Sequence, residues 1–283
     1  MDNFEKVNPA HPDKIMDRIA GAIVDLAYSK DPRPRVAVEG CIGHGLCTIL
    51  IETSVDIESN EVRDIVDRIC QDDISTYMIR VVGQDEKLAE NQREKIRCGD
   101  NGYFVGLPIT ETQQKLTDIV SDIYDSTPTD GKALITPDTI VICQSNIDSK
   151  EFSVGNRRLI VNPLGRWTGG TEVDSGAINR KLGSDLGDAV RGAGLHGKDL
   201  SKADVTGQIV AHLFAQRFNV EVTVTCGIGD EELVICWDEE DGECKEYRLP
   251  FDEAVRLAWV YVSEIGGFEK LAEWGIIRPN RKV

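Results

Sequence analysis

The sequence is poor in several residue types and patterns that would point to particular classes of protein. Aromatic residues make up 6% of its 283 residues, and only four histidines are present. None of the eight cysteines forms a Cys-x-x-Cys pair, which argues against a zinc site. No apolar run approaches the roughly 20 residues that a membrane-spanning helix needs, and no signal peptide is visible. We therefore expect a cytoplasmic protein with reduced thiols and no membrane partner.

Basic residues are also in the minority. Lys and Arg number 32 against 49 Asp and Glu, which gives a formal net charge of −17. Binding along a nucleic-acid backbone relies on a basic surface, so we do not expect a nucleic-acid partner. A nucleotide can still bind where a few cations converge. The hydrophobic content of 41%, mainly Val, Ile and Leu, suits the core of a mixed α/β globule.

The most informative pattern is a helix followed by a hairpin, which occurs twice. Residues 11–52 predict a helix, with Ile15, Ile19 and Ile23 on one face, and then two strands. Residues 202–237 repeat this order. The hairpins even share a similar tip, Val-Ala-Val-Glu-Gly-Cys-Ile-Gly in the first copy and Val-Thr-Val-Thr-Cys-Gly-Ile-Gly in the second. Such self-similarity indicates that one supersecondary unit was duplicated.

A third, shorter copy lies between these two. Its helix is predicted at 111–124 and its strands at 132–135 and 138–144, and the segment 148–158 is predicted to be irregular, without a second helix. The expected fold class is α+β, with three related helix-plus-hairpin units in a pseudo-threefold arrangement and their sheets packed inward. The expected units are 12–98, 99–160 together with 1–11, which is trimmed, and 161–283, which carries a glycine-rich loop.

Two short patterns in the first unit suggest a binding site. His-Pro-Asp-Lys at 11–14 stands at a predicted helix start, where free N–H groups and the helix dipole favour a phosphate. An ordinary helix cap with exposed charges is the plainer interpretation. Glu39 and Glu52 stand in otherwise apolar strands of one hairpin, and two adjacent carboxylates would suit a cation. The alternative is that both lie on the solvated face of the sheet.

Two glycine-rich segments add cations. In residues 162–181, glycines allow close backbone approach, Arg166 and Arg180 are bidentate phosphate donors, and Trp167 offers a stacking face for a base. A flexible loop with incidental cations explains each of these residues singly. Residues 197–204 mix two lysines with acids, which suits a triphosphate held with magnesium. Neither segment is a Walker A loop, and no Gly-x-Gly-x-x-Gly follows a strand, so a Rossmann fold is not expected.

Together these segments resemble the motifs of the methionine adenosyltransferases, also called S-adenosylmethionine synthetases. The segment 11–14 matches the family's amino-terminal motif, although residues 7–10 differ from the usual flank. Gly-Asp-Asn-Gly at 99–102 is similar to its Gly-Asp-Gln-Gly loop. The segments 162–181 and 197–204 match its glycine-rich and lysine-rich motifs. All four occur in the family's order, across about residues 8–230, in a chain that is shorter than typical members.

The resemblance implies an activity and partners. The sulfur of L-methionine would attack C5′ of ATP, forming S-adenosylmethionine, and the released tripolyphosphate would then be hydrolysed. The family works as a homodimer or a dimer of dimers, with active sites shared between subunits. It uses two Mg²⁺ ions per site and K⁺.

The resemblance also implies residue roles. The catalytic residues would be His11, Lys132, Arg180, Lys181 and Lys198. The contacts to ATP would be His11, Asp130, Lys132, Arg166, Trp167, Asp174, Arg180, Lys181, Gly194 and Lys198. The contacts to methionine would be Glu52, Gln84, Asp100, Asp174 and Lys202. The metal ligands would be Asp13 and Asp204 for magnesium and Glu39 for potassium.

Two other functions stay open at this point. The altered flank at 7–10, Asn101 and the shortened loop after Gln84 favour a catalytically weakened relative that acts as a nucleotide-binding or regulatory protein. Another ATP-using transferase with a different nucleophile is the second alternative. The charged positions of the four motifs are all present, which favours an enzyme.

Overall fold

The computed structural model describes residues 3–70, 74–85, 87, 90, 96–154, 157–190, 194–239 and 242–280. Among these residues it contains three β-sheets and seven α-helices, so the predicted α+β class is confirmed. All eight cysteines are free thiols. No helix within the described ranges is both long and apolar enough to cross a membrane.

The first sheet has the strand order β10-β2-β3-β4. Its elements, with the helices that join them, are α1 (Pro12–Lys30), β2 (Val36–Gly43), β3 (Leu46–Thr53), α2 (Ser59–Ile69), β4 (Thr76–Gly83) and β10 (Ser175–Ala177). Strands β2 and β3 form the predicted antiparallel hairpin, and β4 returns parallel to β3. Strand β10 comes from the glycine-rich segment, so the third predicted unit contributes an edge strand to the first sheet.

The second sheet has the order β1-β6-β7-β9-β8. Its elements are β1 (Phe4–Val7), α4 (Glu111–Ser126), β6 (Gly131–Ile135), β7 (Thr139–Gln144), β8 (Lys150–Val154) and β9 (Arg157–Val161). The described part of 148–158 contains no helix, as predicted, but the prediction that it is irregular was wrong, because β8 and β9 pair there. Leu159, Ile160 and Val161 favour a strand, and β7 offers a free edge to which β9 adds in parallel.

The third sheet has the order β13-β12-β11-β5. Its strands and the neighbouring helices are β5 (Gly102–Gly106), α5 (Leu182–Leu186), the 3₁₀ turn η1 (Gly187–Ala189), α6 (Ala203–Phe218), β11 (Val222–Cys226), β12 (Glu232–Asp238), β13 (Cys244–Pro250), α7 (Phe251–Glu264) and α8 (Phe268–Trp274). A helix followed by an antiparallel strand pair thus occurs three times, as α1-β2-β3, α4-β6-β7 and α6-β11-β12.

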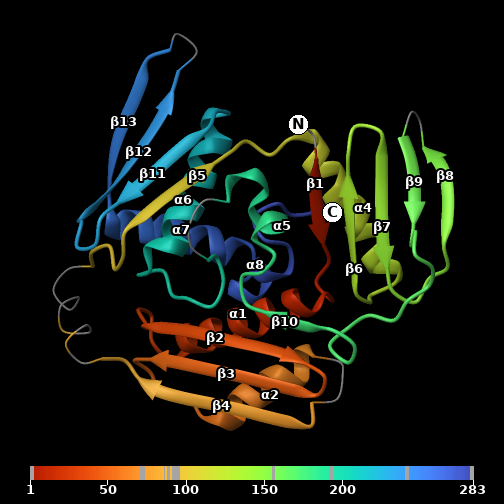
Figure 1. Cartoon of the computed structure of the whole chain (residues 1–283). Helices are drawn as coiled ribbons and strands as arrows, with labels where there is room; N and C mark the ends of the chain where they lie inside the picture. The colour runs from red at the N-terminus through yellow and green to blue at the C-terminus, as the bar shows by residue number, and fades with distance from the viewer. Residues whose placement is uncertain are drawn as a thin grey trace.

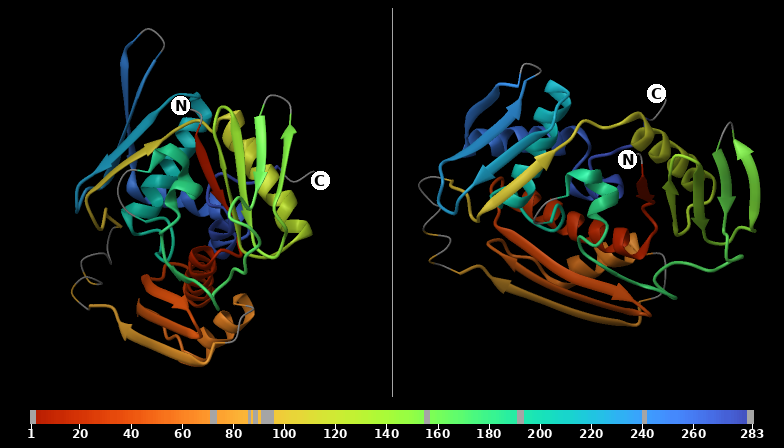
Figure 2. Two further views of the ribbon diagram at one scale, coloured as in Figure 1. Left: turned by 45° about the vertical axis from the view of Figure 1, so that its right-hand side comes forward. Right: turned by 45° about the horizontal axis from the view of Figure 1, so that its top comes forward.

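The three sheets lie around a group of central helices. In Figure 1, α1, α6, α7 and α8 occupy the middle, and Figure 2 shows the same arrangement from two further sides. The pseudo-threefold arrangement stays a prediction, but the sheets face these central helices rather than one another. The physical reason is that α1 is apolar on more than one side. Ile19 and Ile23 are fully buried in one cluster with Ile49 and Ile51 of β3, so the helix supplies the core and the sheet covers it.

Candidate active site

The start of α1 holds the first two predicted site residues. His11 is the N-cap, and its Nδ1 accepts the backbone N–H of Asp13 at 3.2 Å. Both side chains are buried. Pro12 occupies the first helical turn, where its missing N–H costs no hydrogen bond, and the Asp13 carboxylate complements the helix dipole.

The glycine-rich segment places two cations beside Asp13. Its Oδ1 accepts the N–H of Ala177 at 2.9 Å, which fixes this segment to α1. Arg180 Nη1 lies 3.4 Å from the same oxygen, and Lys181 Nζ lies 3.7 Å from Oδ2. The Arg180 side chain is more than half exposed, so its guanidinium can also reach an anion in solution.

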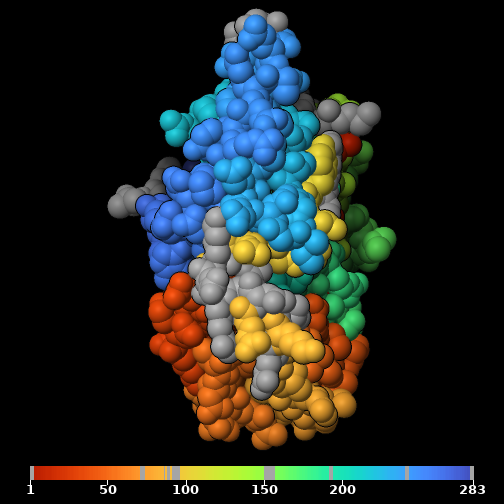
Figure 3. All heavy atoms as spheres, turned by 90° about the vertical axis from the view of Figure 1, so that its left-hand side faces the viewer, coloured from red at the N-terminus to blue at the C-terminus, as the bar shows by residue number. Residues whose placement is uncertain are grey.

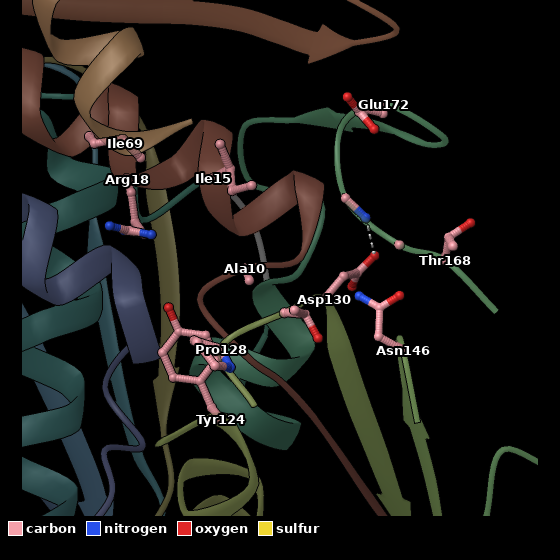
Figure 4. A pocket seen from close by; sticks show the side chains of 13 residues that line it. Ala10, Ile15, Arg18, Ile69, Tyr124, Pro128, Asp130, Asn146, Thr168 and Glu172 are labelled. Atoms are coloured by element: carbon pink, nitrogen blue, oxygen red, sulfur yellow. Dashed lines mark hydrogen bonds between the residues drawn. The ribbon is translucent and has the colours of Figure 1, made fainter. Parts of the chain in front are cut away.

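Asp130 stands at the entrance to β6, in a cavity of about 290 Å³. Figure 4 shows its carboxylate between Asn146 and the segment that carries Thr168. Oδ2 accepts the N–H of Gly170 at 3.1 Å, whereas Oδ1 is buried and has no hydrogen-bond partner among the described residues. Burial raises the pKa of Asp130 to about 6, and the nearby Asp174 carboxylate raises it further while Lys132 lowers it. A buried oxygen without a donor is costly, so this atom is suited to receive one from a ligand.

Three further residues that are expected to contact ATP have defined neighbours. The indole N–H of Trp167 donates to Asn162 at 3.0 Å, and the Trp167 ring lies next to Gly169, close to Asp130. Arg166 is exposed and lies 3.4 Å from Asp148. Gly194 packs against the side chain of Asn179, the residue before Arg180.

Burial, together with the charges nearby, determines the protonation state of His11. Burial lowers the pKa of His11 to about 3, and Lys181 and Lys132 lower it further. The imidazole is therefore neutral at pH 7. Because Nδ1 already accepts an N–H, the single ring proton is on Nε2, which leaves one neutral donor facing away from the helix. We call His11, Asp13, Asp130, Lys132, Asp174, Arg180 and Lys181 the first group.

Other predicted residues meet at the start of α6. Lys198 Nζ lies 2.6 Å from Oδ2 of Asp204, and Lys202 is the N-cap of the helix. The loop that carries Asp100 is next to this segment, because a Cβ on Gly99 would lie 3.5 Å from the carbonyl oxygen of Ser201. Asp100 itself is exposed.

Three further predicted residues belong to the first sheet or to the end of its last strand. Glu52 pairs with Ala37 and Glu39 with Leu50, so the two glutamates are diagonal neighbours on one face. Gln84 follows β4, donates its N–H to Thr53 at 3.0 Å, and has a buried Oε1 without a partner among the described residues. We call Lys198, Lys202, Asp204, Asp100, Glu39, Glu52 and Gln84 the second group.

The two groups meet β2 at different places. Ser175, next to Asp174 of the first group, pairs with Gly43. Lys198 of the second group pairs with Ala37. These two positions are six residues apart on the strand, which corresponds to about 20 Å. The described residues of the two groups therefore reach this strand at separate places.

The sequence did not reveal a buried charged cluster beneath the first group. Lys14 Nζ lies 2.7 Å from both carboxylate oxygens of Asp185 and 3.1 Å from Asp17, and His196 Nε2 lies 2.9 Å from Asp185. The donor atoms of Asp17, Asp185 and His196 would suit a metal. The Lys14 ammonium already fills this place, so the cluster is an internal ion network. Asp17 and Asp185 are 168 residues apart in the chain, so no local sequence pattern predicts this contact.

The chain is also similar to known proteins. Residues 3–91 match the family model for the N-terminal domain of S-adenosylmethionine synthetase. An S-adenosylmethionine synthase of Myxococcus xanthus is 26% identical over 82% of this chain and 76% of that protein. One of Clostridium botulinum is 28% identical over 80% and 75%.

The chain is therefore similar to S-adenosylmethionine synthetases, in its N-terminal part by the family model and over most of its length by these relatives. The alignments leave about a quarter of each relative unmatched. A solved structure described as an unusual S-adenosylmethionine synthetase from Campylobacter jejuni has the same fold. It matches with a TM-score of 0.73 and 18% identity, over 97% of this chain and 93% of that one.

Proposed function

We propose that this protein is a methionine adenosyltransferase that forms S-adenosylmethionine from ATP and L-methionine. The observation that carries the proposal is the first group, in which three cations and a neutral histidine surround one helix N-terminus. Such a site suits a triphosphate. The named sequence relatives support the same activity.

The first group would act on the leaving group. Lys132, Arg180 and Lys181 would stabilise the charge that develops on the triphosphate as the C5′–O bond breaks. The Nε2–H of His11 would donate a hydrogen bond to a phosphate oxygen, and the imidazole would stay neutral while it does so. Methionine attacks through a thioether sulfur, which has no proton to lose, so no general base is needed.

The cavity beside Asp130 would hold the adenosine. Its unpartnered Oδ1 would accept a hydrogen bond from the nucleoside, and Trp167 would stack on the base. Arg166 and Gly194 would line the path of the phosphates. Holding sulfur and C5′ in line supplies up to about 7–11 kcal/mol in favourable cases.

Magnesium fits the carboxylates of Asp13 and Asp204, because hard cations prefer such oxygens. Two Mg²⁺ ions per site would neutralise triphosphate charge when bound. Each carboxylate is now balanced by a lysine of the chain, Lys181 or Lys198, and these lysines would turn to the phosphates. Glu39 offers one exposed carboxylate oxygen pair to potassium, and the rest of that ion's ligands would come from elsewhere.

Four members of the second group would bind methionine. Glu52 and Asp100 would attract the α-ammonium group, and Lys202 and Gln84 would contact the remaining polar atoms, together with Asp174 of the first group. The unpaired Oε1 of Gln84 supports a role in binding, since it needs a donor. The tripolyphosphate would afterwards be hydrolysed on the cations that hold it.

We further propose a homodimer, alone or as a dimer of dimers, in which the first group of one copy meets the second group of the other. The separation of the two groups along β2 supports this arrangement. Large apolar side chains exposed on the outer strand faces support it too. They include Leu50, Met78, Tyr103 and Leu134. The three helix-and-hairpin units, 12–98, 99–160 with 1–11, and 161–283, would be related by a pseudo-threefold axis.

The test is direct. Purified protein is incubated with ATP, L-methionine, Mg²⁺ and K⁺, and S-adenosylmethionine is measured by mass spectrometry. The expected result is product that needs both substrates, and Arg180→Leu serves as the matched inactive control. ATP binding without product would instead favour a nucleotide-binding relative, and product from another nucleophile would favour a different transferase.

A further inference from the structure

A second and larger cavity, of about 600 Å³, lies where α7 meets the end of α1. In Figure 3, the blue atoms of the C-terminal part lie directly above the red-orange atoms of the N-terminal part on this side of the molecule. The lining residues that matter here are Tyr28, Arg33, Arg35, Asp199, Arg256 and Trp259. No described residue with a proposed role in the reaction lines the cavity.

One wall is a flat aromatic surface. Trp259 of α7 is 44% exposed, and its ring stacks on Tyr28 with a centroid distance of 4.7 Å. Tyr28 in turn stacks on Phe268 at 5.3 Å. The stack fixes the orientation of the indole, and the exposed part of Trp259 can receive a second ring.

The rim carries an excess of positive charge, in a molecule whose formal net charge is −17. Arg35 Nη1 lies 3.7 Å from Asp199, and Arg256 Nη2 lies 3.2 Å from Asp252. Arg33 is exposed, and its guanidinium has no ion-pair partner among the described residues. Pro32 and Pro34 restrict the backbone on either side of it, so this guanidinium is presented from a stiff segment.

We propose that this cavity binds a small planar aromatic anion. Its ring would stack on Trp259, and its carboxylate or phosphate would receive a bidentate pair of hydrogen bonds from Arg33. The cavity volume is in the range of small-molecule sites. The proposal is independent of the reaction proposed above, because it concerns other residues and needs neither ATP nor methionine.

The cavity shares a segment with the second group. The N–H of Leu200 donates to the Tyr28 hydroxyl at 3.1 Å, and Asp199 accepts the N–H groups of Val36 and Ser201, both at 2.8 Å. These contacts hold residues 199–201, which connect Lys198 to Lys202. A ligand in the cavity would therefore touch the chain segment that positions both lysines.

Isothermal titration calorimetry of the whole protein tests the proposal, without nucleotide. The probes share one ring system: 2-naphthoate carries a carboxylate, 2-naphthyl phosphate a phosphate, and 2-naphthamide no charge. We expect one molecule of at least one anion to bind per chain, and the amide to bind at least tenfold more weakly. The better anion identifies the preferred head group.

Variants distinguish binding in this cavity from non-specific binding elsewhere on the protein. Trp259→Ala and Arg33→Glu should each weaken binding about tenfold or more, and both positions are exposed enough to leave the fold intact, which circular dichroism checks. The matched controls are Tyr247→Ala and Arg248→Glu, an exposed aromatic residue and an exposed arginine on β13, which should bind as the wild type does.

Several results would overturn the proposal. They are no binding of either anion at millimolar concentration, equal binding of the amide, and unchanged affinity in either cavity variant. If Trp259→Ala instead separated the protein into monomers, the patch would be a contact between copies and the proposal would fail.

Discussion

The Nζ atom of Lys198 lies 2.6 Å from Oδ2 of Asp204, so the carboxylate that we propose for magnesium is neutralised by an amine of the same chain. The pair is partly shielded from water, since Asp204 is buried and Lys198 is mostly so. A divalent ion between Asp204 and a triphosphate would release the lysine toward the phosphates. Before the substrate binds, each of the two side chains thus neutralises the charge of the other.

We therefore predict that Asp204→Asn raises the magnesium concentration needed for half-maximal rate by about tenfold or more. Asp13→Asn should act in the same direction, because its carboxylate serves the other side of the triphosphate. Rates measured across a magnesium titration check this, with Asp238→Asn, at an exposed strand end, as the control. An unchanged magnesium response in both variants would contradict the metal roles.

Removing single cations of the first group should slow the reaction strongly without unfolding the protein. Lys132→Met and Arg180→Leu each remove a charge from the proposed triphosphate site, and both side chains are exposed. We expect the rate to fall by roughly 10²–10³, as for the loss of one preorganised donor, and the free energy of unfolding to change by less than about 1 kcal/mol. Product formation and urea unfolding are the measurements. Wild-type turnover in either variant would rule out its assigned role.

The sequence was informative where the structure is local. The spacing of Ile15, Ile19 and Ile23 predicted α1, and the alternation in β2 and β3 predicted their hairpin, because a helix or a strand pair leaves its own period in the residues that form it. The structure places those isoleucines fully or almost fully inside the core.

The sequence could not predict what depends on distant partners. Strand β10 has three residues, Ser-Gly-Ala, and it exists because β2 offers an edge and Asp13 accepts the N–H of Ala177, 164 positions away. The same holds for Lys14 and Asp185. The motifs likewise placed Asp13 and Asp204 at helix starts, but only the register along β2 shows that the segments beside them reach this strand at different places.

Asp130 should limit stability in a way that depends on pH. Its pKa is raised to about 6 in the folded chain, against an ordinary value of 3.8. Between these values the folded state binds more protons than the unfolded state, so stability falls as pH rises from about 4 to 6, and the cost is fully present above pH 6.

We accordingly predict that Asp130→Asn stabilises the protein by about 1–3 kcal/mol at pH 8 and by little near pH 4, while product formation is lost. Asparagine keeps an acceptor for the Gly170 N–H but carries no charge. Urea unfolding at the two pH values is the measurement, and Asp138→Asn, on the surface, is the control. Equal effects at both pH values would show that the buried charge is not the cause.

Mixing two inactive variants tests whether each site is shared between copies. Lys181→Met damages the first group and Lys202→Met the second, and neither residue is fully buried. In a mixed dimer, one site would carry both lesions and the other none. Random exchange makes about half of the dimers mixed, so the mixture should regain about a quarter of the wild-type rate. Unfolding and refolding the two variants together, against each refolded alone, gives the comparison. Mass spectrometry checks that the mixtures contain mixed dimers. If they do and the rate does not recover, the first group of one chain does not combine with the second group of another.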